Sequence, residues 1–244
     1  VQPLFQVLVL VSDAAANAET ELYQTRANLL DPDKNIIEAK EFIPVFEKTN
    51  TLKTFDRWMI RYCIGELAKL NENEDEKFAV FIALSEQSLN DKGLSDWINK
   101  LLEYVKMPKL GSALIFEINA ENFLEQHRQA KIQINKLRVK LGASIALTDI
   151  QNIAMLEDCL QQEKFDFIMF SPEHIIDGKM EQEDIQAMAA KAKENNSLSI
   201  ASKIDSGEYL AMAASVGVDY VLGHFVQPPM ENIVASDSVE VTDR

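Results

Sequence analysis

The sequence predicts an α/β fold, and within that class a parallel barrel. Six short apolar strand candidates alternate with helical segments and begin roughly 20–35 residues apart, the length of one strand–helix–strand unit. Two further strand-like runs precede them as a hairpin-like opening. No glycine-rich dinucleotide fingerprint or P-loop follows any strand candidate, which argues against a doubly wound nucleotide-binding sheet. The 244 residues match the length of one barrel, so we expect a single domain over 1–244.

The opening consists of the runs 5–11 and 21–30, which are rich in Val and Leu and are joined by a short polar connection. A turn follows at 31–33, where the sequence reads Asp-Pro-Asp. Residues 51–70 carry apolar side chains at steps of three and four, which predicts an amphipathic helix. The acidic run 71–76 is typical of a solvated connection. The chain starts at Val1 rather than Met, and we expect it to be a domain excised from a longer protein.

Strands and helices then alternate. Helical segments are predicted around 94–105 and from Ser206 to Gly217. Between them lies one long helix whose apolar face runs from Phe123 to Leu141, with Asn119 as its N-cap and Gly142 just past its end. The six strand candidates are 78–84, 113–118, 144–147, 165–170, 198–201 and 220–222.

Composition excludes several classes of function. The 39 Asp and Glu residues outnumber the 24 Lys and Arg residues, which gives a net charge of −15. Nucleic-acid polymers are bound mainly through Lys and Arg, so we expect no such partner. No apolar run approaches the roughly 18 residues of a membrane span, so we expect no membrane contact from this domain. Cys63 and Cys159 form no metal or redox motif, which favours reduced thiols and a cytoplasmic location.

In a parallel barrel, reacting groups project from the C-terminal ends of the strands. Only two carboxylates, Glu117 and Asp149, stand at those positions, which is too few for a two-metal site. We therefore expect no metal site and no cofactor. The pair could perform acid/base chemistry in a hydrolase, or could simply be solvated at the barrel mouth. Lys203 is expected to pair with Asp205, and His127 to be a core histidine.

Five segments carry a specific likeness. They are Gln-Pro at 2–3, EFIPV at 41–45, FDRW at 55–58, FEI at 116–118 and GVDY at 217–220. In this order they resemble the characteristic segments of EAL domains, the cyclic di-GMP phosphodiesterase family. The resemblance implies a modified TIM (β/α)8 barrel with one antiparallel strand, which agrees with the hairpin-like opening.

Most metal and catalytic positions that the resemblance implies carry other residues in this chain. Those positions hold Gln24, Asn28, Ala83, Thr148, Met169, Ser171 and Ser202. Of the implied acidic set, Glu117 and Asp149 remain. Neutral side chains do not offset two divalent charges, and no lysine remains at position 169 to activate a water. The resemblance therefore implies a degenerate domain that is not an enzyme.

The chain looks most similar to the non-catalytic, FimX-type EAL domains of type IV pilus regulators. This resemblance implies a regulatory domain in cyclic di-GMP signalling that acts by contact with a signalling protein, a PilZ-type protein being one candidate. A metal-independent receptor for cyclic di-GMP and an unrelated hydrolase using the two carboxylates are the alternatives. Few candidate ligand contacts are cationic, so we expect weak dinucleotide binding. The candidates are Gln2, Asn28, Asp56, Ser85, Glu117 and Asp149.

Overall fold

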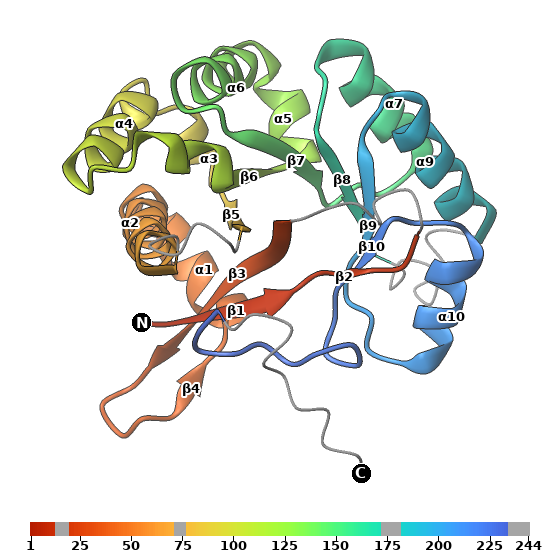
Figure 1. The fold of residues 1–244 in the computed structure, drawn as a ribbon, viewed down its shortest axis with the longest axis horizontal. Helices are drawn as coiled ribbons and strands as arrows, with labels where there is room; N and C mark the ends of the chain where they lie inside the picture. Colours follow the sequence, from red (N-terminus) through yellow and green to blue (C-terminus); the bar gives the residue numbers. More distant parts are fainter. Residues whose placement is uncertain (13–19, 71–76, 172–181, 234–244) are drawn as a thin grey trace.

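The computed structural model describes residues 1–12, 20–70, 77–171 and 182–233. In this part of the chain, ten strands form a sheet in the order β1-β3-β5-β6-β7-β8-β9-β10-β2, with β4 paired to β3 beside this path. β1 (Gln2–Val7) and β2 (Val9–Leu10) are consecutive in the chain but stand at opposite ends of the order. The sheet therefore closes into a barrel (Figure 1).

One extended segment supplies the antiparallel strand of this barrel. β1 pairs antiparallel with β3 (Thr20–Leu30), and β2 pairs antiparallel with β10 (Tyr220–Val221). The predicted run 5–11 is thus interrupted at Leu8, whose backbone N–H donates to the carbonyl of Leu22 at 2.8 Å. The hairpin-like opening and the modified barrel with one antiparallel strand are confirmed.

The predicted alternation of strands and helices is also confirmed. Parallel strands form the rest of the barrel wall, and helices cover its outer face (Figure 1). The strands are β5 (Lys77–Ala83), β6 (Leu114–Asn119), β7 (Ser144–Thr148), β8 (Phe167–Phe170), β9 (Leu198–Ala201) and β10. The outer helices include α2 (Leu52–Leu70), α4 (Leu94–Tyr104), α7 (Ile153–Gln162), α9 (Gln182–Glu194) and α10 (Gly207–Ser215).

The apolar core has two layers. The larger layer lies between the strands and the helices, where Ile60, Ile64 and Leu67 of α2 are fully buried. The smaller layer fills the barrel interior and includes Leu22 of β3 and Phe81 of β5. Side chains alternate between the two faces of a strand, so each wall strand contributes to both layers.

The predicted long helix is wrong in one respect. It is divided into α5 (Ala120–Glu125) and α6 (His127–Leu141), and the break lies at Gln126, which has φ −122° and ψ 28°. A straight helix would place His127 on the apolar face, but the break leaves this side chain half-buried, so the expected core histidine is wrong as well. The predicted caps are confirmed: the Asn119 side chain accepts from a backbone N–H of α5, and Gly142 has φ +70° after α6.

The sequence patterns do not predict the elements that follow β3. The chain turns back as β4 (Ile36–Ile37), which pairs with the end of β3, and continues into α1 (Ala39–Lys48). Pro44 lies inside α1 and removes one backbone donor, which weakens the helical signal in the sequence. The predicted acidic connection 71–76 lies outside the described residues. Among the described helices, none combines the length and apolar character needed to cross a bilayer.

Candidate functional site

The inner face of β3 carries three polar side chains in a row. Leu22 belongs to the interior layer, whereas Tyr23 and Ala27 pack in the layer between strands and helices. Because side chains alternate along a strand, Gln24 and Arg26 follow Leu22 on the inner face, and Asn28 continues the row toward the C-terminal end. The row therefore ends at the rim where the parallel strands also end.

Gln24 links this row to the neighbouring strands. Its amide nitrogen donates to Oε1 of Glu117 on β6 at 2.7 Å and lies 3.7 Å from Sδ of Met169 on β8. Its amide oxygen accepts a hydrogen bond from Nε of Arg26 at 3.3 Å. A guanidinium, an amide and a carboxylate thus form one chain of hydrogen bonds across the barrel.

Burial dominates the electrostatics of Glu117. Desolvation raises the pKa of its carboxyl to about 7, and the charge of Asp149 acts in the same direction. The hydrogen bond from Gln24 and the positive charge of Arg26 oppose this rise. Burial in turn lowers the pKa of Arg26, while the carboxylates of Glu117 and Asp205 raise it. Arg26 is therefore a cation whose charge is favoured by two carboxylates of this site.

Asp149 lies near Glu117 but has partners of its own. Its Oδ2 accepts from the Asn119 amide at 3.0 Å and from the Thr148 hydroxyl at 3.4 Å. Asp149 has φ +56° and Lys203 has φ +58°, a left-handed conformation that is uncommon outside glycine. Asp149 directly follows β7 and Lys203 follows β9 by two residues, but four other non-glycine residues of the described chain share this conformation, so it does not by itself mark the site.

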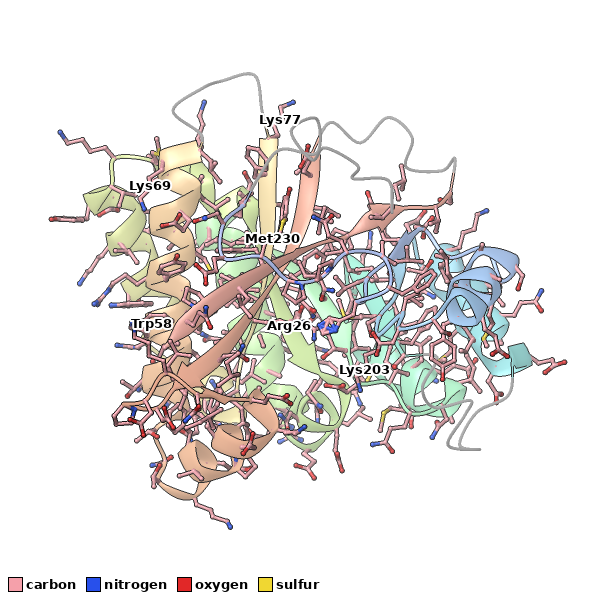
Figure 2. The ribbon with its side chains drawn as sticks, turned by 90° about the horizontal axis from the view of Figure 1, so that it is seen from below. Arg26, Trp58, Lys69, Lys77, Lys203 and Met230 are labelled. Atoms are coloured by element: carbon pink, nitrogen blue, oxygen red, sulfur yellow. The ribbon has the colours of Figure 1, made fainter. Side chains whose placement is uncertain are left out.

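A cavity of about 850 Å³ opens between α1, the second half of β3 and the first turns of α2. Figure 2 shows two of its lining residues: Arg26 lies near the middle of the barrel, and Lys203 lies farther from Lys77, the first residue of β5. Aromatic and aliphatic side chains cover much of the remaining wall. They include Phe42, Phe55, Met59, Ile82 and Leu84.

Three of the six predicted ligand-contact residues line this cavity, namely Asn28, Asp56 and Ser85. Gln2, Glu117 and Asp149 are not part of its wall. Gln2 instead donates to the Glu231 carboxylate at 2.6 Å, between β1 and the segment after β10. Glu117 reaches the cavity only indirectly, through the amide of Gln24. The structure therefore separates the predicted set into three places. Asn28, Asp56 and Ser85 lie in the cavity wall, and Gln2 lies apart from it beside Glu231. Glu117 and Asp149 lie with Gln24, Arg26 and Met169 at the bottom of the barrel mouth, which we call the barrel floor.

Asp56 has the contacts of a structural residue. Its Oδ2 accepts from the backbone N–H of Ser85 at 2.8 Å, from its hydroxyl at 2.5 Å and from the hydroxyl of Ser88 at 2.6 Å. Burial raises the pKa of Asp56, and the serine hydrogen bonds oppose that rise. Ser85 also caps the short helix α3 (Glu86–Leu89). The carboxylate therefore ties α2 to the end of β5, and its exposure to a ligand is small.

The side chains on the barrel floor do not fit a divalent metal ion. Such an ion needs several converging oxygen ligands, but Glu117 faces the N–H donors of Gln24, with the guanidinium of Arg26 beside them. Ala83, at the end of β5, contributes a methyl group. Among the described residues, no group of three or more His, Cys, Asp or Glu side chains could hold a metal.

Arg26 is the residue that sequence reasoning missed. The family resemblance implies an arginine at position 28, where this chain has Asn28, and gives no role to the arginine at position 26. The available signal was the alternation along β3, since residues 24, 26 and 28 of one strand must share a face.

Comparisons with a family model and with a curated protein both find similarity over most of the chain. The model of the EAL domain family matches residues 5–229. Cyclic di-GMP phosphodiesterase PdeF of Escherichia coli K12 is 22% identical over 208 residues, which cover 84% of this chain and 27% of that protein. The chain thus spans about a quarter of the length of this curated relative.

Solved structures agree in fold. The FimX EAL domain from Pseudomonas aeruginosa bound to cyclic di-GMP has a TM-score of 0.84 at 23% identity, covering 97% of this chain and 93% of its own. The Xanthomonas citri FimX EAL domain in complex with cyclic di-GMP has a TM-score of 0.77 at 18% identity, covering 95% and 89%. At such identities the likeness establishes the fold.

Proposed function

Because this chain belongs to the EAL domain family, we propose that it is a catalytically inactive regulatory domain in cyclic di-GMP signalling. One observation carries the proposal: the Gln24 amide donates to Glu117, and the Arg26 guanidinium stands beside it. These groups supply N–H donors and positive charge on a floor where metal-assisted hydrolysis needs anionic ligands.

Within the described part of the chain, this floor also lacks the lysine that the family resemblance implies as the group that activates water. Met169 projects from β8 at the position where the family resemblance implies a lysine, and its thioether neither takes up nor releases a proton at neutral pH. Glu117 is already a hydrogen-bond acceptor of Gln24. Both features support the proposal that the domain binds or signals without cleaving a phosphodiester.

We expect the regulatory action to occur through contact with a signalling protein, as the FimX-type resemblance implies. A specific observation favours a second candidate, a metal-independent receptor for cyclic di-GMP. The 850 Å³ cavity has the size of a small-molecule site. Arg26 and Lys203 bring positive charge to a wall that also carries Lys40 and the acidic residues Glu38, Glu47, Asp56 and Glu86. The two FimX domains of similar fold were solved with that dinucleotide.

The alternative of an unrelated hydrolase that uses Glu117 and Asp149 has less support. An acid/base pair must reach the scissile bond with free carboxyl oxygens. Glu117 is buried beneath Gln24, and Asp149 accepts from Asn119 and Thr148. Neither side chain lines the cavity.

The test of inactivity is direct. The purified domain is incubated with cyclic di-GMP and either Mg²⁺ or Mn²⁺, and the linear dinucleotide is measured by chromatography beside an active phosphodiesterase. We expect no product above the control without enzyme. Gln24→Glu alone should not restore activity, since one added carboxylate leaves position 169 without a lysine. Product that disappears in the Glu117→Gln variant would refute the proposal.

A further inference from the structure

We infer that Arg26 is a built-in cation that replaces divalent metal ions in this domain and forms a metal-free binding centre for a phosphodiester. This inference rests on the second candidate function, the receptor for cyclic di-GMP. It assigns to one side chain both the charge balance of the barrel floor and the recognition of the ligand's phosphate.

First, the Arg26 guanidinium lies in the field of two carboxylates. Carboxylates from two different parts of the barrel act on Arg26: Glu117 from β6 and Asp205 from the segment after β9. A cation beside two carboxylates offsets part of their negative charge, which is one part of a metal ion's role. Unlike a metal, it is covalently part of the chain and needs no acidic ligands from residues 24, 83 and 148.

The second step concerns the donors that remain available. Only Nε of Arg26 is engaged, by Gln24 at 3.3 Å. Within the described residues neither terminal nitrogen has a hydrogen-bond partner, and neither belongs to the set of buried unsatisfied atoms. Arg26 lines the cavity, and its terminal nitrogens stay accessible because they are neither hydrogen-bonded nor fully buried. A guanidinium fork of this kind matches two oxygens of one phosphate group.

The third step is the fixed orientation of this fork. Arg26 extends from the middle of β3, where the strand is paired with β1 and Leu4 is its partner in the register; the pairing with β5 ends two residues earlier, at Gln24. The Gln24 amide holds Nε, and Glu117 holds the amide nitrogen of Gln24 in turn. Such preorganisation lowers the conformational cost of binding. Lys203 and Asn28 line the same cavity and can contact the same ligand.

A purely structural role for Arg26 predicts a different result. If the guanidinium only neutralised buried carboxylates, its replacement would lower stability and leave the affinity of the folded domain unchanged. The affinity for a phosphodiester, measured on folded protein, therefore separates the two roles.

The experiment is titration calorimetry of the domain with cyclic di-GMP, in EDTA and in Mg²⁺. We compare the natural chain with Arg26→Met and with Arg61→Met as the matched control. Arg61 is exposed on α2, lies over the Trp97 ring at 5.9 Å, and loses the same charge on substitution. We expect equal affinity within about twofold in EDTA and Mg²⁺, a loss of at least about tenfold in Arg26→Met, and a change of less than about twofold in Arg61→Met.

Circular dichroism checks that each variant is folded. If Arg26→Met does not fold, Arg26→Lys keeps the charge but loses the planar fork, and it should still weaken binding several-fold. Affinity that requires Mg²⁺, equal affinity in the two methionine variants, or no binding by the natural chain would each overturn the inference. None of these results bears on the inactive-domain proposal, which only the hydrolysis assay can refute.

Discussion

Replacing Glu117 by glutamine should change how the stability of this domain depends on pH. The Glu117 carboxyl is buried, and its pKa of about 7 lies about 2.5 above the ordinary value of 4.5. In the folded state it therefore keeps its proton to higher pH than in the unfolded chain. The free energy of unfolding consequently falls as pH rises from about 4.5 to about 7, and then levels off. At 1.36 kcal/mol for each pH unit, the loss amounts to about 3 kcal/mol.

The amide side chain of the Glu117→Gln variant does not titrate, so this loss should be absent. Urea unfolding between about pH 4.5 and pH 8 measures the difference, and the variant should gain about 3 kcal/mol relative to the natural chain over that range. The Gln24 amide can rotate to keep a hydrogen bond with the new side chain. Glu121→Gln, at an exposed position of α5, is the control and should follow the natural chain. Parallel curves for the natural chain and Glu117→Gln would show that burial does not govern this carboxyl.

Three further outcomes are expected. Gly223→Ala would place a Cβ 2.2 Å from the backbone N and O of Ile204, which forces a backbone shift. The free energy of unfolding, measured in urea, should fall by about 3 kcal/mol. Gly65→Ala is the control, because a Cβ there has open space and causes no such clash. Asp56→Ala removes the acceptor of the buried Ser88 hydroxyl and of the half-buried Ser85 hydroxyl, and it should lower the unfolding free energy by about 2–4 kcal/mol; a melting temperature equal to that of the natural chain would contradict this. Asn28→Arg adds a second guanidinium to the cavity wall and should strengthen cyclic di-GMP binding about tenfold by calorimetry, and unchanged affinity would count against a phosphate at this position.

The barrel could be predicted because its strands are short apolar runs separated by helical periodicity. The breaks within the predicted strand 5–11 and within the predicted long helix could not be predicted, because they depend on packing against distant parts of the chain. The interruption at Leu8 arises because β1 and β2 pair with strands from opposite ends of the sequence. The break at Gln126 sets the separate directions of α5 and α6, which a single apolar periodicity does not encode.

The site was predictable in part for a similar reason. Glu117 was found because it ends a strand, and strand ends meet at the barrel mouth. Its contact with Gln24, however, joins residues 93 positions apart and depends on the register of β3. Asp56 was read as a ligand contact, but its three serine hydrogen bonds appear only once α2 is packed against β5. Side-chain partners of this kind follow from tertiary packing, not from local sequence.

The closure of the barrel by β2 and β10 has a consequence for the order of folding. The contact between Ser12 and Asp219 at this seam spans 207 residues, and closing a loop of that length costs about 5 kcal/mol of chain entropy. The β1–β3 pair joins much nearer segments and can form early, whereas the seam must form last. At a synthesis rate of about 5–20 residues per second, β10 is made about 10–40 s after β2, so β2 has no partner strand during that time. For that time the edge of β2 is open to pairing with other chains, so we expect any misassembly of this barrel to start at the seam between β2 and β10.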